Sequence, residues 1–180
     1  MFQVDLVEKC KRNDRNAQLA LYQKYSRGMY CVAMRFLKNG NDAEDILQEA
    51  FVKAFRKIDQ YKGDVSFGAW LKKIVVNQSL DFLKSKQLEV VELKEAYMQV
   101  EDDGDWSVDV EVTVKEVMEA IERLPGKYRE VVQLFLVEGY GHHEVSEILK
   151  ISHTASRTRL LRGKVHLKEL LKTSKYVARS

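Results

Sequence analysis

Residues 130–164, EVVQLFLVEGYGHHEVSEILKISHTASRTRLLRGK, contain the pattern that decides the fold of the second half of the chain. The glycine-bearing EGYG interrupts a helical run after Val137, HHEVSEILK predicts a short helix, and KIS predicts a tight turn. Ser152 stands where the next helix needs an N-cap. This succession predicts a helix-turn-helix, whose second helix enters the major groove of duplex DNA.

The predicted second helix keeps one sign of charge, because residues 151–167 contain four cations and no acid. Leucines at helical spacing give it an apolar face, made of Leu160, Leu167, Leu170 and Leu171. Arginine can pair with guanine in bidentate fashion, and hydroxyls can contact base edges or phosphates. A solvated basic helix would not need the turn, the cap and the preceding short helix. We therefore predict a DNA-contacting face made of Ser152, His153, Thr154, Arg157, Thr158, Arg159 and Arg162.

In the first half, residues 41–58, NDAEDILQEAFVKAFRKI, carry apolar residues at helical spacing without a break. Asn41 is the expected N-cap, with Glu44 reaching back to it as in a capping box. The opposite face shows Asp45, Gln48, Glu49, Lys53 and Arg56. This face has two interpretations: a solvated helix surface with acids near the positive end of the dipole, or a docking surface for a basic partner.

A second helix is predicted over residues 67–86, after the loop YKGDVSF. A stripe of Lys73, Asn77, Leu80 and Lys84 lies on one side of it. Lysines that follow phosphates, beside aromatic residues that hold an unstacked base, are typical of single-stranded nucleic-acid binding. The aromatic candidates are Tyr61 and Phe67. The alternative is that the aromatic rings belong to the core and the lysines are only solvated.

The whole chain predicts an all-α protein with two small helical domains. Residues 1–86 and 112–180 are the predicted domains, and the acidic stretch 87–111 is the predicted linker. The net charge of +3 is a weak argument for nucleic acid, so the distribution of charge carries that case. The N-terminus lacks the apolar run of a signal peptide, and no stretch is long and apolar enough to span a bilayer. A cytoplasmic protein with reduced thiols and no membrane insertion is expected.

Catalytic and metal chemistry have no pattern to support them. HHEVSE ends in Glu147 where a zinc protease would need a histidine, and the remaining histidines lack companions at ligand spacing. There is no phosphate-binding loop and no nucleophile elbow. We expect no enzyme activity, no catalytic residues, no metal, no cofactor and no small-molecule substrate.

Three segments together resemble a known family: DAEDILQEAF (42–51), SFGAWLKKIVVNQSLDFLK (66–84) and LPGKYREVVQLFLVEGYGHHEVSEIL (124–149). They are similar to bacterial RNA polymerase sigma factors of the extracytoplasmic-function (ECF) type, in the sigma-70 family. The resemblance covers nearly the whole chain, in the family's order and spacing. It implies a sigma-two-like bundle and a sigma-four-like helix-turn-helix bundle joined by a flexible linker. Such proteins bind core RNA polymerase and direct it to promoters.

The resemblance also implies roles for particular residues. Asp45, Gln48 and Glu49 match the surface for the polymerase clamp helices. The set Tyr61, Phe67, Lys73, Asn77 and Lys84 falls in the part that melts and recognises the minus-ten element, where the family captures a flipped base. The face that begins at Ser152 matches the recognition helix for the minus-thirty-five element. An inhibitory partner, an anti-sigma factor, is implied by the family alone, and the acidic linker is a candidate mimic of nucleic acid inside the polymerase.

The sequence departs from the family at three places. Lys150 stands where the family often has glycine, and Ala155 and Ser156 stand where it often has threonine and valine. Gly163 lies in mid-helix, at a cost of about 1 kcal/mol relative to alanine. Two other functions compete with the sigma-factor interpretation. One is a dimeric helix-turn-helix regulator of a palindromic operator, which leaves the first half unexplained, and the other is a helical adaptor that binds only proteins.

Overall fold

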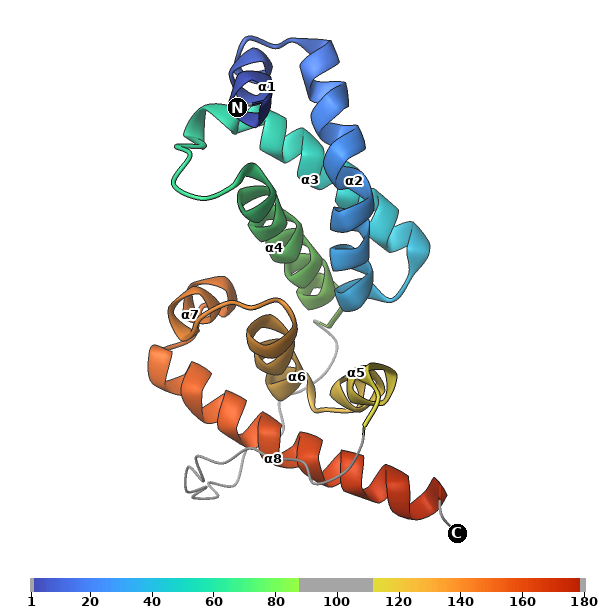
Figure 1. The fold of residues 1–180 in the computed structure, drawn as a ribbon. Helices are drawn as coiled ribbons and strands as arrows, with labels where there is room; N and C mark the ends of the chain where they lie inside the picture. Colours follow the sequence, from blue (N-terminus) through green and yellow to red (C-terminus); the bar gives the residue numbers. More distant parts are fainter. Residues whose placement is uncertain (1, 88–111, 179–180) are drawn as a thin grey trace. The chain divides into compact units, whose positions relative to one another are not determined.

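The structure is a computed structural model that describes residues 2–87 and 112–178. The chain divides into two compact units, Met1–Leu93 and Lys94–Ser180, which are described separately (Figure 1). Every regular element in the described ranges is a helix, so the prediction of an all-α fold is confirmed. The predicted linker 87–111 lies outside the described residues apart from Gln87. Within the described ranges, no helix combines the length and the apolar character needed to cross a bilayer.

The first unit is a bundle of α1 (Phe2–Lys11), α2 (Arg15–Leu37), α3 (Gly40–Arg56) and α4 (Phe67–Gln87). A single 3-10 turn, Ile58–Gln60, follows α3. Helix α2 packs against both α3 and α4, which also pack against each other (Figure 1). Helix α1 packs on α2 and on the 3-10 turn.

The apolar face predicted for α3 forms the centre of this core. Its buried residues are Ala43, Ile46, Leu47, Ala50, Phe51 and Ala54. Helix α4 contributes fully buried side chains to the same core, which are Phe67, Leu71, Val75 and Val76. Burial of each large side chain contributes on the order of 1.5–3 kcal/mol, so these side chains are the main source of stability of the first unit.

The N-cap of α3 is Asn39, and the prediction of Asn41 is wrong. The side-chain oxygen of Asn39 accepts hydrogen bonds from the backbone amides of Asn41 and Asp42, at 2.9 and 3.1 Å. Asn39 has extended backbone, whereas Gly40 already begins the helix. The two asparagines of KNGN are two residues apart, and the one before the glycine satisfies the free amides of the first turn.

The second unit contains α5 (Val114–Glu122), α6 (Gly126–Val132), α7 (His142–Leu149) and α8 (His153–Ala178). A π-helical turn, Gln133–Val137, continues α6. Helix α8 runs along α5, α6 and α7 and packs against each of them. Its buried leucines are Leu160, Leu167 and Leu171, as the leucine spacing predicts.

Gly163 has a packing role that the sequence analysis missed. A Cβ built on Gly163 would lie 2.5 Å from Cγ2 of Val132 on α6. Glycine is therefore required where α8 crosses α6, and the propensity cost of glycine in mid-helix is offset by this close approach.

Candidate nucleic-acid interface

The turn between α7 and α8 fixes where α8 begins. Lys150 ends α7 in the left-handed conformation, with φ of 57°, and the backbone amide of Ile151 donates to the carbonyl oxygen of Ser146 at 3.1 Å. Glycine is preferred in this conformation because it has no Cβ, which explains why the family often has glycine here. Oγ of Ser152 accepts from the amide of Ala155 at 3.0 Å, so the predicted cap of α8 is confirmed.

The first turns of α8 present the predicted DNA-contacting residues together. The exposed members are Ser152, His153, Thr154, Arg157 and Thr158, whereas Arg159 and Arg162 are half-buried. Leu160 and Ser156 point into the unit. The helix-turn-helix therefore holds hydroxyls and guanidinium groups on one solvent-facing side of a helix whose other side is anchored.

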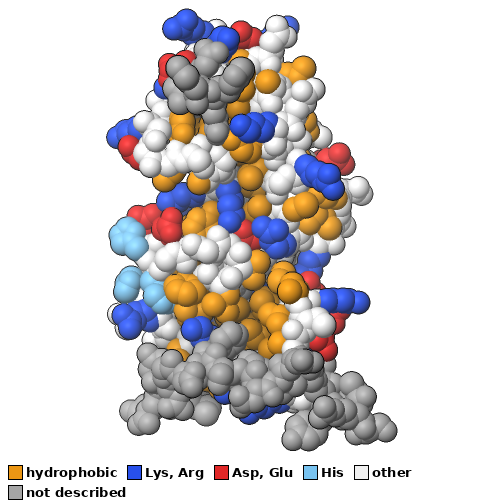
Figure 2. Space-filling model, viewed as in Figure 1, with side chains coloured by type: hydrophobic (Ala, Val, Ile, Leu, Met, Phe, Trp, Pro, Cys, Tyr) orange, Lys and Arg blue, Asp and Glu red, His pale blue; other side chains and the backbone are white. Residues whose placement is uncertain are grey.

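Ser156 has a partner that the sequence analysis did not find. Its side chain is 0% exposed, and its Oγ lies 2.9 Å from Nδ1 of His142 on α7. A buried serine hydroxyl needs a hydrogen-bond partner, which is either a carbonyl of its own helix, as for Ser79 with Val75, or a polar group of a facing element such as His142. Figure 2 shows histidine side chains gathered over α7 and the start of α8.

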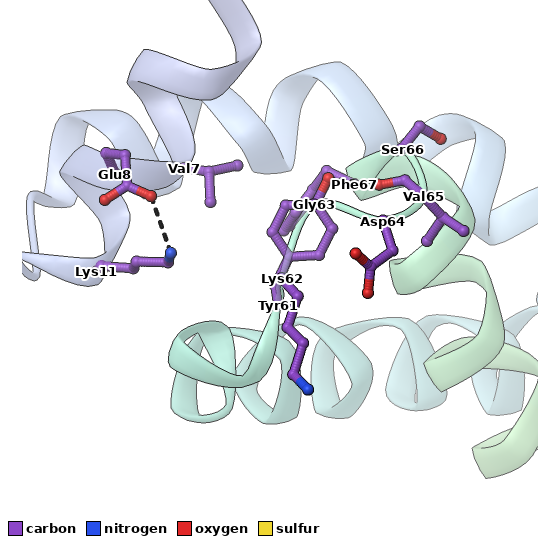
Figure 3. Close-up of a pocket in the computed structure, with 10 residues that line it drawn as sticks. All are labelled: Val7, Glu8, Lys11, Tyr61, Lys62, Gly63, Asp64, Val65, Ser66 and Phe67. Carbon is purple, nitrogen blue, oxygen red and sulfur yellow. Dashed lines mark hydrogen bonds and ion pairs between the residues drawn. The ribbon is translucent and has the colours of Figure 1, made fainter.

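In the first unit, a cavity of about 530 Å³ lies between α1 and the loop before α4 (Figure 3). One wall is made by Val7, Glu8 and Lys11 of α1, and the other by residues 61–67. Nζ of Lys11 is 2.8 Å from Oε1 of Glu8, so this wall carries an ion pair beside Val7. The α1 wall was not predicted, because α1 is distant in sequence from the loop.

The loop wall is held by its own contacts. The hydroxyl of Tyr61 donates to the carbonyl oxygen of Val65 at 2.6 Å. Gly63 has φ of 85°, a conformation that favours glycine, and it allows the chain to turn between these two residues. Lys62 and Asp64 are exposed on the rim. A cavity whose lining combines valine and tyrosine side chains with charged and hydroxyl groups can take a flat ring with polar edges.

Phe67 forms part of the core below this loop. Its ring is 0% exposed and packs edge-on against Tyr61, with ring centres 5.7 Å apart. The ring of Phe67 therefore serves the core of this unit and has no exposed surface in this structure, and its predicted contact with DNA stays a prediction. Tyr61 is half-buried and remains a candidate.

The predicted stripe on α4 is only partly at the surface. Lys84 is exposed, Lys73 and Asn77 are half-buried, and Leu80 is a core residue with 1% exposure. Lys73, Asn77 and Lys84 therefore share a side of α4. Lys73 and Asn77 are one helical turn apart, and the buried Leu80 separates them from Lys84.

The acidic face of α3 borders a second cavity, of about 570 Å³, on the α4 side. Gln48 and Glu49 line it, and Asp45 is exposed one turn earlier on α3. Lys53, Arg56 and Lys57 also line it, so its charges are mixed. Three lining residues were missed by the sequence analysis, which are Val52, Lys57 and Gln78. Val52 is 49% exposed, and Oε1 of Gln78 is buried and accepts no hydrogen bond from the described residues. An isolated valine among polar residues on the outer face of α3 is the pattern that could have indicated this cavity.

Two family models match the chain. The model of Sigma-70 region 2 matches residues 21–89, and the model of Sigma-70 region 4 matches residues 115–167. Together they cover about two thirds of the chain, one in each unit. The chain belongs to the sigma-70 family.

Relatives place this sigma factor in the ECF type, as the resemblance implied. It is 29% identical to the ECF RNA polymerase sigma factor SigW of Bacillus subtilis (strain 168), over 92% of this chain and 95% of the relative. It is 26% identical to the ECF RNA polymerase sigma-E factor of Escherichia coli (strain K12), over 88% of each protein. The sigma factor therefore has a role in promoter-specific transcription by RNA polymerase, in a family of regulatory proteins that are not catalysts.

Two solved structures have a similar fold. CnrH, in complex with the cytosolic domain of CnrY, has a TM-score of 0.59 and 22% identity, over 95% of this chain and 97% of that chain. The sigma factor RpoE, in complex with the anti-sigma factor NepR from Bartonella quintana, has a TM-score of 0.58 and 20% identity, over 85% and 95%. The region 2 match also accounts for the first unit of the sigma factor, which a dimeric operator-binding regulator leaves unexplained.

Proposed function

We propose that this sigma factor recognises the minus-thirty-five element as duplex DNA through α8 and the melted minus-ten element through the first unit. The observation that carries the proposal is the anchored α8, which presents Thr154, Arg157 and Thr158 on one exposed side within the region 4 match. Bidentate contacts from arginine to guanine discriminate bases by about 1–3 kcal/mol each. Ser152, His153, Arg159 and Arg162 complete the face, and neutralised phosphates add salt-sensitive affinity.

The minus-ten element is assigned to the cavity between α1 and the loop 61–67, together with Lys73, Asn77 and Lys84 of α4. An unpaired base that enters the cavity leaves the stack, at a cost of a few kcal/mol, and contacts with the walls offset that cost. Tyr61 supports the loop and the edge of the cavity, while the lysines follow the phosphates of the single strand. The sigma factor thereby captures bases that thermal opening exposes.

Core RNA polymerase is assigned to the face of Asp45, Gln48 and Glu49, extended by the cavity that contains Val52 and Gln78. The rim of this cavity is mixed in charge, because Glu49 stands on it together with Lys53, Arg56 and Lys57. We expect the polymerase surface to place a basic group at Asp45 and Glu49, an apolar side chain against the exposed Val52, and acidic or polar groups near the three cations. A donor from that partner would satisfy Oε1 of Gln78, which is costly to leave buried and unpaired.

Three further expectations belong to this proposal. The two similar structures contain an anti-sigma factor or a partner's cytosolic domain, which supports an anti-sigma partner for this chain. The protein acts in the cytoplasm, where its polymerase is. The domain boundaries at residues 86 and 112, and nucleic-acid mimicry by the acidic linker, stay predictions. Deletion of Glu101 to Asp105 without effect on initiation or promoter escape would count against the mimicry.

The deciding experiment is in vitro transcription with core polymerase on a library of genomic fragments. The sigma factor is expected to give defined start sites that core enzyme alone does not use. Arg157→Ala should reduce initiation at those promoters by the equivalent of about 1–3 kcal/mol in duplex binding. The matched control is Lys115→Ala, which removes an exposed cation on α5 outside the predicted face. Start-site selection without any response to Arg157→Ala would contradict the role of α8.

A further inference from the structure

Two polar side chains meet inside the helix-turn-helix. Ser156 lies on the buried side of α8, and His142 is the first residue of α7. The 2.9 Å contact between Oγ and Nδ1 joins the two helices of the motif. Because Arg157 follows Ser156 directly, a shift of Ser156 moves the proposed DNA-contacting face with it.

The surroundings of His142 disfavour a positive charge. The ring of Phe135 covers it at 4.6 Å, and the ring of His153 stands edge-on at 5.7 Å. Burial first, and then the charges of His153, Arg157 and Lys164 on α8, lower the pKa of His142 below its ordinary value. His142 also begins a helix, where the backbone amides carry partial positive charge.

The charged groups on α7 itself are engaged elsewhere. Oε2 of Glu144 accepts from the backbone amide of Gly141 at 2.9 Å, and Nδ1 of His143 lies 3.6 Å from Oε1 of Glu147. Among the described residues, the charged groups that shift the pKa of His142 are His153, Arg157 and Lys164, and all three lower it.

We propose that His142 is a positioning residue for the DNA-contacting helix through its contact with Ser156, and that the cations of α8 around it make the placement of that helix depend on His142 being uncharged. The proposal rests on the proposed function of α8. In the uncharged imidazole one ring nitrogen donates and the other accepts, so either tautomer can bond to the Ser156 hydroxyl. The protonated ring can still donate from Nδ1 to Oγ of Ser156, so the bond alone does not require the uncharged form. Protonation instead adds a positive charge beside the cations of α8, in a partly buried place, and the resulting repulsion disfavours the close approach of the two helices.

The direction of the pH effect follows from the lowered pKa. A histidine whose pKa is lower in the folded state stabilises the fold fully above its unfolded pKa, about 6.5, and less as the pH falls below it. Acid therefore loosens the contact between α7 and α8. This effect acts on the placement of α8 and does not alter the exposed residues that we propose to contact DNA.

The first test is an NMR titration of the four histidine rings in the full chain. His142, assigned with the His142→Asn variant, is expected to titrate at a lower pH in the folded chain than in the urea-unfolded chain. Titration at the same or a higher pH would overturn the proposal. This measurement requires no DNA.

The second test compares binding of a promoter duplex, taken from the transcription experiment, at about pH 8 and about pH 5.5, on either side of histidine's ordinary pKa. His142→Asn places an amide near the position of Nδ1 and cannot become charged. It should bind like the wild type in mild alkali and about two- to tenfold more tightly than the wild type in acid. His142→Ala should weaken binding at both values, because Ser156 loses its partner.

This second test compares the ratio of the DNA-binding affinity of the wild type to that of the variant at the two pH values, because the other three histidines are present in both proteins. The matched control is His143→Asn, which changes the neighbouring histidine, whose side chain is 82% exposed. Removal of an exposed histidine can only take away positive charge that attracts DNA in acid, so His143→Asn should bind no more tightly than the wild type at either pH value. A constant ratio for His142→Asn would overturn the proposal, whereas failure of Arg157→Ala to weaken binding would instead overturn the proposed function of α8.

Discussion

Gly163 of α8 lies so close to Val132 of α6 that an added Cβ would stand 2.5 Å from Cγ2 of the valine. The valine is fully buried on α6 and cannot move aside without disturbing the core of the second unit.

Replacement of Gly163 by alanine is therefore expected to destabilise the second unit by about 1–3 kcal/mol, although helix propensity alone predicts a gain. Amide hydrogen exchange in α8 measures the effect. The matched control is Gly28→Ala on the exposed side of α2, where an added Cβ meets nothing within 4 Å. The control should gain about 0.5–1 kcal/mol, and a similar gain at Gly163 would contradict the close approach.

Asn39→Ala is expected to destabilise the first unit by about 1 kcal/mol, because the first-turn amides of α3 lose their acceptor. Urea unfolding of the first unit, followed by the fluorescence of Trp70, measures it. Asn41→Ala is the paired variant, and its cost should be smaller by most of that amount. Equal costs would mean that the two asparagines share the capping role.

Lys150→Gly is expected to stabilise the helix-turn-helix by about 0.5–1 kcal/mol. A side chain in the left-handed conformation costs about 1–2 kcal/mol, and part of this is offset by the greater backbone entropy that glycine loses on folding. Thermal unfolding at matched pH measures the change. Lys150→Ala keeps the strain while it removes the charge, so a gain in that variant would trace the effect to charge instead.

Glu49→Lys is expected to weaken binding to core polymerase by about 1–3 kcal/mol, because it reverses a charge on the wall of the α3–α4 cavity. Competition between variant and wild type for a limited amount of core enzyme measures the loss. Glu44→Lys makes the same change on the same helix, at an exposed position outside the cavity lining. If both reversals weaken binding equally, general charge rather than this surface determines the affinity.

The parts of the fold that depend on local periodicity were predictable from the sequence. The buried faces of α3 and α8 and the Ser152 cap follow from spacing and from the hydrogen-bonding needs of a helix start. Spacing does not reveal which asparagine has extended backbone, so the cap of α3 was assigned two residues late.

Contacts between distant segments were not predictable in the same way. The wall that α1 gives to the loop cavity, the meeting of Gly163 with Val132, and the bond between His142 and Ser156 each join residues whose partner is set by tertiary packing. The role of Phe67 could not be predicted from the sequence either. An aromatic residue beside a loop suits both base stacking and a core, and only its burial distinguishes the two.

The hydrogen bond from Tyr61 to the carbonyl oxygen of Val65 has a consequence for the base capture that we propose for this loop. A loop already closed on itself does not have to be ordered when a strand arrives, so little conformational entropy is lost at that moment. A preorganised loop of this kind selects a base by shape complementarity, because the loop does not rearrange to fit a base of a different shape.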